Sequence, residues 1–272
     1  MYLMKLLNGK EIAEFKKAQQ AQAVRRLRQQ FKVFPKLAIV ITKDDPVINT
    51  YVKLKKQYGH DILIDVEIYH VVQDGVYELL DSLNHDDSIH GVIVQLPLDN
   101  PDETDQVCDT VAPLKDVDAL GKAAIYDPAT PMAILWLLAG FNVSLDGKKV
   151  VVVGRGKLVG APLERMLTQS DIDVTVVDRS TENIADVIMA ADIIITATGS
   201  PALIDAAMLP PNCVVVDAGV AVESGRTVGD LNPDVYERDD LTITPVKGGV
   251  GPLTVCALFE NVIRAAQDSI AQ

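Results

Sequence analysis

The first half of the chain alternates between amphipathic segments with helical spacing and short apolar runs typical of buried strands. The predicted helices cover residues 10–30, 46–58 and 74–84, and the predicted strands cover residues 36–41, 62–69 and 91–95. Asp45 and Pro46 have the residue types of a helix cap and a first helical position, and Gly59 is expected to end that helix. This alternating order predicts a mostly parallel α/β layer.

A second alternating series begins at Lys148. Its predicted strands cover residues 148–153, 174–178, 193–197, 213–217 and 241–245, and its predicted helices cover residues 181–190 and 253–271. Residues 96–147 separate the two series. They are rich in proline, aspartate and glycine at both ends and contain one apolar helical segment near residues 133–139, which is typical of a domain boundary.

The two series predict an α/β fold with two α/β domains and a cleft between them, because small ligands bind in such clefts. We place an N-terminal domain at residues 1–120 and a Rossmann-type dinucleotide-binding domain at residues 121–254. The C-terminal helix, residues 255–272, is expected to pack back on the first domain.

The stretch from Lys148 to Pro162 combines a predicted strand, a glycine turn and the start of a helix. Its four consecutive valines suit a parallel strand covered on both faces. Gly154, Gly156 and Gly160 let the backbone turn sharply near a phosphate, to which the following helix would present free N–H groups. The spacing is one residue longer than the usual dinucleotide fingerprint, so an ordinary tight turn is the alternative.

Asp178 closes the second strand of this series, about 20 residues after the glycine turn, where an acidic residue commonly holds a ribose 2′-hydroxyl. Arg155 and Arg179 lie where they could instead neutralise a 2′-phosphate. Asp178 could equally pair with Arg179 and bind no ligand. The pattern therefore leaves the choice between NAD and NADP open.

The composition indicates which kinds of binding partner and which cellular compartment to expect. A formal net charge of −13 argues against an extended nucleic-acid or anionic-membrane surface. The three cysteines are far apart and the four histidines show no ligand spacing, so we expect no metal site and a reducing cytoplasm. The N-terminus lacks a signal-peptide pattern, and no apolar run reaches the roughly 20 residues that span a bilayer. We expect a small-molecule substrate, no nucleic-acid partner and no membrane partner.

Polar residues of the first half could carry chemistry. Tyr51 and Lys55 are four residues apart and share one helix face, where a lysine of lowered pKa could act as a base. Spacing alone, however, favours a solvated lysine-rich face. Gln95 ends a predicted strand, where side chains project into the crevice of an α/β sheet. Asp116 and Asp118 lie in a loop, and pattern alone favours a solvated turn over a carboxylate that binds a heterocycle.

Residues 244–254 contain three glycines and two prolines ahead of the C-terminal helix. This density predicts a shaped loop whose backbone meets a ligand, because a purely structural turn would need fewer glycines.

Together these stretches resemble the bifunctional methylenetetrahydrofolate dehydrogenase/cyclohydrolase family over nearly the whole chain. Seven patterns of the family have counterparts here: Y-V-x-x-K-x-K, V-Q-L-P-L, K-D-V-D-G, P-C-T-P, G-R-S-x-x-V-G-x-P, V-G-D and T-P-V-P-G-G-V-G-P-M-T. They correspond to residues 51–57, 94–98, 115–119, 128–131, 154–162, 228–230 and 244–254. The chain departs from these patterns at Gln57, Ala119, Ala129, Gly156, Lys247 and Leu253.

The resemblance implies oxidation of 5,10-methylenetetrahydrofolate with a nicotinamide cofactor, followed by hydrolysis of the methenyl product to 10-formyltetrahydrofolate, in one-carbon metabolism. It implies that Lys55 activates or positions water, Gln95 orients Lys55, Tyr51 contacts the folate and Asp118 binds the pterin. Further expected folate contacts are Leu96, Pro97, Gly248, Gly249, Pro252 and Thr254. Expected cofactor contacts are Gly154, Arg155, Gly156, Val159, Gly160, Asp178, Arg179, Thr198, Gly199 and Gly219.

Some departures from the family patterns affect which cofactor, NADP or NAD, is expected. Gly156 replaces a family serine and removes a hydroxyl donor, and Asp178 stands where a histidine is common. Arg155 matches the family arginine that meets a 2′-phosphate, so we expect NADP, with NAD as the alternative. The resemblance also suggests a homodimer through the nucleotide-binding domain.

Two other functions remain open at this point. One is a two-domain dehydrogenase of another small metabolite, like those of shikimate or amino acids, against which the set Tyr51, Lys55, Gln95 and Asp118 argues. The other is a catalytically weakened ligand-binding protein, suggested by the substitutions in the family patterns. Retention of Lys55 argues against that second function.

Overall fold

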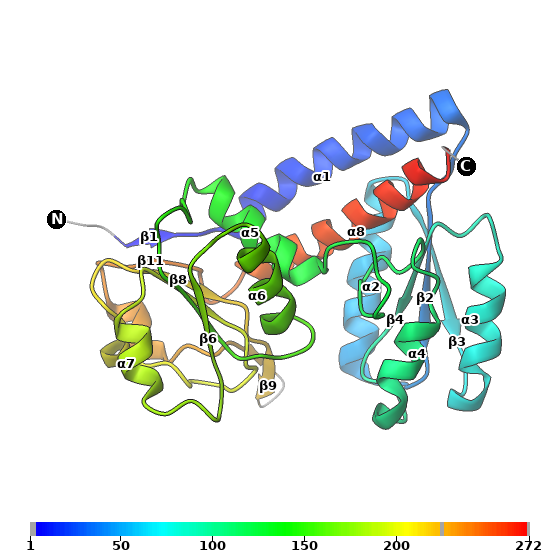
Figure 1. Ribbon diagram of the computed structural model, residues 1–272. Coiled ribbons are helices and arrows are strands. Elements are labelled where there is room, and N and C mark those ends of the chain that lie inside the picture. The colour runs from blue at the N-terminus through cyan, green and yellow to red at the C-terminus, as the bar shows by residue number, and fades with distance from the viewer. Residues whose placement is uncertain (1–3, 224–225, 271–272) are drawn as a thin grey trace. The chain divides into compact units, whose positions relative to one another are not determined.

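The computed structural model describes residues 4–223 and 226–270, which form two α/β units (Figure 1). One unit comprises Met1–Ala13 and Thr130–Thr254, and the other comprises Glu14–Ala129 and Val255–Gln272. The division falls within two long helices, α1 (Gly9–Arg26) and α8 (Val250–Asp268), and after the first residue of α5 (Ala129–Gly140). Both units contain a parallel sheet, which confirms the predicted fold class.

The unit that contains Lys55 is built on a three-stranded parallel sheet of order β3-β2-β4. Its strands are β2 (Lys36–Ile41), β3 (Asp65–His70) and β4 (Gly91–Val94), and its helices include α2 (Pro46–Asp61), α3 (Val76–Asn84) and α4 (Thr104–Thr110). Ala38 and Val40 point to the face that packs against α3 and α4, whereas Ile39 points to the opposite face and is equally buried. After Lys36, strand β2 is therefore apolar because both of its faces are covered.

Helix α2 begins as predicted and ends later than predicted. The Asp45 carboxylate accepts hydrogen bonds from the backbone N–H groups of Val47 and Ile48 at 2.7 and 3.3 Å, which confirms the cap. The helix continues through Gly59, where a Cβ would lie 2.5 Å from Val66 Cγ2. Gly59 therefore does not end the helix but lets it pack closely on β3.

The other unit contains a six-stranded sheet of order β1-β11-β8-β7-β5-β6, in which all pairs are parallel. The strands are β1 (Lys5–Leu6), β5 (Val150–Val153), β6 (Val174–Val177), β7 (Ile193–Thr196), β8 (Val214–Asp217) and β11 (Thr242–Ile243). The helices are α5 (Ala129–Gly140), α6 (Gly160–Gln169) and α7 (Ile184–Met189). Because β6 and β7 flank β5 on opposite sides, the winding reverses at β5, and the carboxyl ends of β5 and β7 border the crevice where Rossmann-type folds bind ligands.

Some short elements were not predicted from the sequence. These are β1, α4 and the antiparallel hairpin of β9 (Ala221–Glu223) and β10 (Arg226–Val228). Strand β1 pairs with β11, so the described residues before α1 belong to the unit of the six-stranded sheet. The sequence pattern places these residues in the N-terminal domain instead, because a two-residue strand has no recognisable periodicity.

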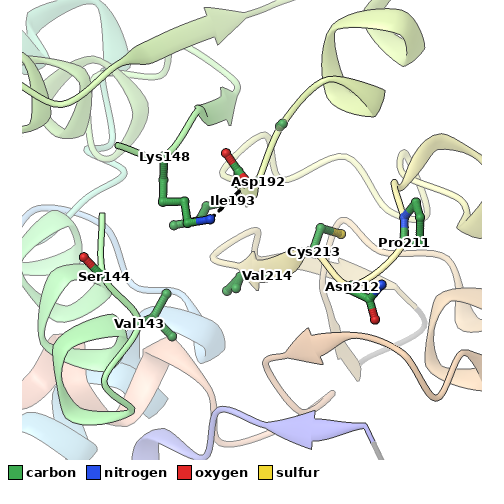
Figure 2. Close-up of a pocket in the computed structure, with 10 residues that line it drawn as sticks. Val143, Ser144, Lys148, Asp192, Ile193, Pro211, Asn212, Cys213 and Val214 are labelled. Atoms are coloured by element: carbon green, nitrogen blue, oxygen red, sulfur yellow. Dashed lines mark hydrogen bonds and ion pairs between the residues drawn. The ribbon is translucent and has the colours of Figure 1, made fainter. Parts of the chain in front are cut away.

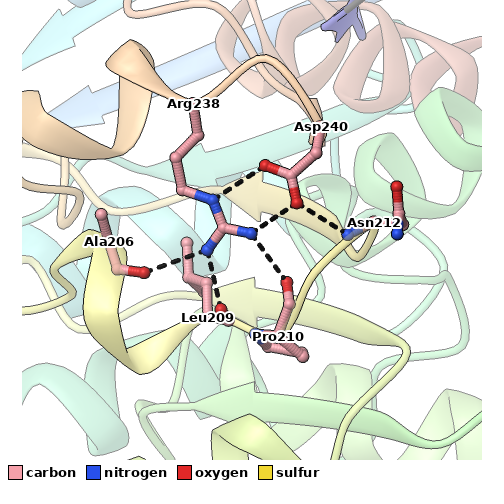
Figure 3. A network of polar contacts seen from close by, with 6 residues as sticks. All are labelled: Ala206, Leu209, Pro210, Asn212, Arg238 and Asp240. Atoms are coloured by element: carbon pink, nitrogen blue, oxygen red, sulfur yellow. Dashed lines mark hydrogen bonds and ion pairs between the residues drawn. The ribbon is translucent and has the colours of Figure 1, made fainter. Parts of the chain in front are cut away.

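Arg238 lies shortly before β11, at the centre of a network of polar contacts (Figure 3). Its guanidinium donates to both carboxylate oxygens of Asp240 at 2.9 and 2.6 Å and to the carbonyl oxygens of Ala206, Leu209 and Pro210 at 2.7–3.2 Å. The Asp240 carboxylate also accepts the N–H of Asn212 at 3.0 Å. This network fixes the loop that leads into β8, and it holds the pKa of Asp240 at about 2 through the Arg238 hydrogen bonds.

Replacing Arg238 with alanine should lower the free energy of unfolding by about 2 kcal/mol, because several carbonyl oxygens and a partly buried carboxylate lose their donor. Urea denaturation would measure the change. The matched control is Lys148→Ala, which removes an exposed ion pair with Asp192 and should change stability by about 0.5 kcal/mol or less. Equal losses in both variants would contradict a special role of the Arg238 network.

Candidate active site

Lys55 and Gln95 are brought together by α2 and the end of β4. The Lys55 Nζ donates to Gln95 Oε1 at 2.7 Å. Gln95 follows β4 directly, and its Nε2 donates to the backbone oxygen of Leu96 at 3.0 Å, which leaves the amide oxygen to face the lysine. The predicted contact between these residues is therefore present, and the Leu96–Pro97 peptide beside it is cis.

Burial distinguishes Lys55 from the other lysines of α2. Desolvation lowers the pKa of Lys55, and the negative charge of Asp118 partly opposes this shift. Lys53 and Lys56 are exposed, so the solvated face that spacing alone favoured describes them but not Lys55. A lysine of lowered pKa loses its proton more readily than a solvated lysine, and the neutral amine can take a proton from water.

Asp118 and Asp116 have different roles in the turn that follows the bridge between Val92 and Asp116. Asp116 is only 4% exposed and accepts hydrogen bonds from the N–H groups of Gly121 and Leu120 at 2.8 and 3.4 Å. The expectation of a solvated turn is therefore wrong for Asp116. Its buried carboxylate, rather than water, accepts hydrogen bonds from the backbone N–H groups of the turn. Burial raises the pKa of Asp118, and the charge of Lys55 opposes this shift.

Ala119 stands where the resembling family has glycine, and its φ of 56° lies in the left-handed region. The backbone of the turn is thus kept despite the substitution, at a strain of roughly 1 kcal/mol. Tyr51 lies one helical turn before Lys55 and is 38% exposed, and Pro97 is also exposed. Both side chains are accessible to a ligand at Lys55.

The glycine turn after β5 is shaped by two of its three glycines. Gly154 has a φ of 104°, and a Cβ there would lie 2.8 Å from the oxygen of Ala197. A Cβ on Gly160 would lie 1.8 Å from the oxygen of Gly154, whereas one on Gly156 would meet no atom within 4 Å. The turn therefore leaves room at position 156 for the serine of the family pattern. Val159 immediately precedes α6 and supplies no side-chain cap.

Charged residues surround this turn. The Arg155 guanidinium is paired with Glu164 at 3.2 Å on the surface. The Asp178 carboxylate accepts from the N–H and hydroxyl of Ser180 at 2.9 and 2.6 Å, and these bonds, with the charge of Arg155, lower its pKa. Ser180 rather than Arg179 is therefore the hydrogen-bond partner of Asp178, and Arg179 is exposed. An ionised carboxylate and an arginine face the same region.

The other predicted cofactor residues lie in the loops after β7 and β8. Thr198 and Gly199 follow β7, and Gly199 has a φ of 64°. A Cβ on Gly154 would lie 3.0 Å from Thr198 Cγ2, so the loop after β7 touches the glycine turn. Gly219 follows β8 and donates its N–H to Asp217 at 2.9 Å.

The predicted glycine-rich loop is shorter than expected, because α8 begins at Val250. Pro252 and Thr254 belong to the first turns of this helix, and Thr254 Oγ1 donates to the Val250 oxygen at 3.4 Å. Gly248 has a φ of 90°, and a Cβ on Gly249 would lie 3.0 Å from the Cβ of Thr244. Gly248 is thus favoured by its left-handed backbone and Gly249 by the close approach of the Thr244 side chain, whichever ligand the loop meets.

Two pockets lie away from the predicted site residues. One, of about 290 Å³, is at the amino ends of β7 and β8 and is bordered by the Lys148–Asp192 pair (Figure 2). The other, of about 800 Å³, is at the amino ends of β2 and β4 and includes Lys36 and His90. Neither is lined by a predicted site residue. In residues 4–223 and 226–270, no helix is long and apolar enough to cross a membrane, and no group of three or more His, Cys, Asp or Glu side chains is arranged to hold a metal ion.

The tetrahydrofolate dehydrogenase/cyclohydrolase catalytic domain matches residues 7–118, and the NAD(P)-binding domain of the same family matches residues 128–270. The bifunctional protein FolD of Macrococcus caseolyticus is 34% identical over 276 residues, which cover 97% of this chain and 98% of that protein.

Solved structures agree with these matches. The bifunctional FolD of Campylobacter jejuni is similar with a TM-score of 0.90 and 32% identity, covering 97% of this chain and 99% of that one. The methylenetetrahydrofolate dehydrogenase-cyclohydrolase of Trypanosoma brucei, complexed with NADP and an inhibitor, is similar with a TM-score of 0.93 and 29% identity over 100% of both chains. The chain therefore belongs to the tetrahydrofolate dehydrogenase/cyclohydrolase family.

Proposed function

We propose that this protein oxidises 5,10-methylenetetrahydrofolate to 5,10-methenyltetrahydrofolate with NADP and hydrolyses that product to 10-formyltetrahydrofolate. The observation that carries the proposal is the hydrogen bond between Lys55 and Gln95, made by a half-buried lysine of lowered pKa near Asp118. The family membership covers both halves of the chain, which favours this function over a dehydrogenase of another metabolite. The Lys55–Gln95 contact argues against a catalytically weakened binding protein.

In the hydrolytic step, neutral Lys55 takes a proton from water while the water oxygen bonds to the methenyl carbon. The adduct then opens by breaking the bond between that carbon and N5, which gains a proton as the formyl C=O forms, so one proton is released overall. Gln95 orients the amine through its amide oxygen. The positive charge of the methenyl substrate further disfavours a protonated Lys55.

The nucleotide half fits a dinucleotide, because its glycine turn follows β5 at the point where the sheet reverses its winding. NADP, when bound, accepts the hydride from the methylene carbon. We propose that Gly154, Gly156, Val159 and Gly160 bind its phosphates and that Arg155, released from Glu164, meets the 2′-phosphate.

We further propose that Tyr51, Leu96, Pro97 and Asp118 contact the folate, together with Gly248, Gly249, Pro252 and Thr254. The exposed Tyr51 and Pro97 beside Lys55 support the first group. We also propose that the protein acts as a homodimer in the cytoplasm, in keeping with its three buried thiols.

Replacing Lys55 with methionine should abolish cyclohydrolase activity, by at least about 100-fold as expected for loss of a general base, while folate and cofactor binding stay within about threefold. Methenyltetrahydrofolate decay and NADPH formation would be followed separately. Lys53→Met, on the exposed side of the same helix, is the matched control and should retain both activities. Wild-type protein that turned over methylenetetrahydrofolate with neither NADP nor NAD would overturn the proposed function.

The pH dependence of hydrolysis should depend on Asp118. Because burial lowers the pKa of Lys55, the rate should rise with pH and level off below pH 10.5, the ordinary lysine value. Asp118→Asn removes the charge that raises this pKa, so the inflection should move to lower pH. The measurement is kcat against pH at saturating substrate, with the exposed Asp81→Asn as control. An inflection that stays in place or moves upward would contradict the role of Asp118.

Asp178 should reduce the preference of the protein for NADP over NAD. Replacing it with serine removes a carboxylate from the region of Arg155, so the ratio of kcat/KM for NADP to that for NAD should rise about tenfold. Asp186→Asn, on α7, is the control. An unchanged ratio would mean that Asp178 faces away from the ribose.

A further inference from the structure

Two acidic residues, Asp217 and Asp230, lie at the carboxyl ends of the strands of the six-stranded sheet; neither is a predicted ligand contact, but both hydrogen-bond residues that are. Asp217 is the last residue of β8, and Asp230 follows the β9–β10 hairpin and is fully buried. Burial and the neighbouring charge of Asp230 raise the pKa of Asp217, while backbone N–H donors lower it. A fully buried carboxylate beside a partly buried one is unfavourable unless hydrogen-bond donors compensate their burial.

Asp230 holds the loop that follows β7. Its Oδ2 accepts the N–H of Thr198 at 2.7 Å, and its Oδ1 accepts the N–H of Ser200 at 3.0 Å. Its backbone oxygen accepts the N–H of Ile204 at 3.1 Å. One residue therefore fixes this loop at three points.

Asp217 in turn holds Asp230. The Asp217 Oδ1 accepts from the Thr196 hydroxyl at 3.0 Å, from the N–H of Gly219 at 2.9 Å and from the N–H of Asp230 at 3.2 Å. Its Oδ2 accepts the N–H of Leu231 at 3.3 Å. The ends of β7 and β8 and the segment after the hairpin are thus joined through one carboxylate.

Two glycines make room for these carboxylates. A Cβ on Gly219 would lie 2.1 Å from Asp230 Oδ1, and a Cβ on Gly229 would lie 2.0 Å from Asp217 Oδ2. The V-G-D stretch at 228–230 therefore has a steric explanation, since any larger residue at 229 would displace Asp217. The glycines and carboxylates form one packed unit.

The loop held by Asp230 also touches the glycine turn. A Cβ on Gly154 would lie 2.8 Å from the Ala197 oxygen, so the two backbones approach as closely as glycine permits. Both segments follow the adjacent strands β5 and β7, at whose carboxyl ends a dinucleotide binds in such folds. A shift of the loop would change the shape of the cofactor site.

We propose that Asp230, held by Asp217, is a positioning residue for the dinucleotide: it keeps the backbone of residues 197–200 in the conformation that binds the cofactor. The inference rests on the proposed function, because it takes the dinucleotide to be the ligand of this edge. It assigns Asp230 no contact with the cofactor itself.

The test replaces Asp230 with asparagine. The asparagine NH2 group cannot accept a hydrogen bond, so one of the two backbone N–H groups, of Thr198 or Ser200, loses its acceptor. The dissociation constant for NADP, measured by isothermal titration calorimetry, and the KM for NADP should each rise about tenfold, which corresponds to about 1.4 kcal/mol. The KM for methylenetetrahydrofolate and the cyclohydrolase kcat should stay within twofold, because Lys55 and Gln95 lie in the other unit. A merely structural role would not separate these values.

Two further variants complete the design. Asp192→Asn changes a carboxylate of the same unit that accepts the Lys149 N–H at 2.9 Å at the amino end of β7, and it should leave NADP binding unchanged. Thr196→Val removes only the hydroxyl donor to Asp217 and should weaken NADP binding two- to threefold even if Asp230→Asn does not fold. NADP affinity within experimental error of wild type in Thr196→Val, or an equal loss of cyclohydrolase activity in that variant, would overturn the proposal. Failure of the proposed function would instead show as an inactive wild-type protein.

Discussion

Both sheets are parallel and covered on both faces, and this constraint determines where polar groups with chemical roles can lie. Strand residues such as Val40 and Val152 are fully buried, so the candidate functional side chains lie at strand ends, in the loops beyond them and, as for Lys55, on a helix that covers the sheet. Gln95, immediately after β4, and Asp217, the last residue of β8, both lie at the carboxyl ends of parallel strands. Gln95 hydrogen-bonds the side chain of Lys55, whereas Asp217 hydrogen-bonds backbone N–H groups, including those of Gly219 and Asp230.

The two units use buried charge in different ways. Lys55 is desolvated so that its amine loses a proton more easily, and its single hydrogen-bond acceptor is a neutral amide that does not restore the positive charge. Asp217 instead has several donors that compensate its burial. The first arrangement leaves a reactive group, whereas the second rigidifies a loop, and proton transfer and cofactor binding need these two properties respectively.

Glycines serve three separate purposes in this chain. Gly154 and Gly248 supply left-handed backbone, Gly59 permits a helix to approach a strand, and Gly219 makes room for a carboxylate. Gly156 meets none of these needs, which agrees with the serine found there in the family pattern. Conversely, Ala119 occupies a left-handed position that glycine would fill without strain. Substitutions in the family patterns have therefore left the backbone of both turns intact.

The sequence alone determined the alternation of helices and strands and the two-unit α/β class, because these depend on local periodicity. It selected Tyr51, Lys55, Gln95 and Asp118 as candidates only through the linear patterns shared with a family, since their spacing by itself favoured solvated positions for Lys55 and Asp118. It could not determine the role of Gly59, the burial of Asp116 or the start of α8 at Val250, since each depends on residues distant in the chain. Only the tertiary structure showed that Lys55 is half-buried while Lys53 is exposed, and that Asp230 reaches Thr198 across 32 residues. Desolvation and long-range hydrogen bonds arise from packing, which no local pattern encodes.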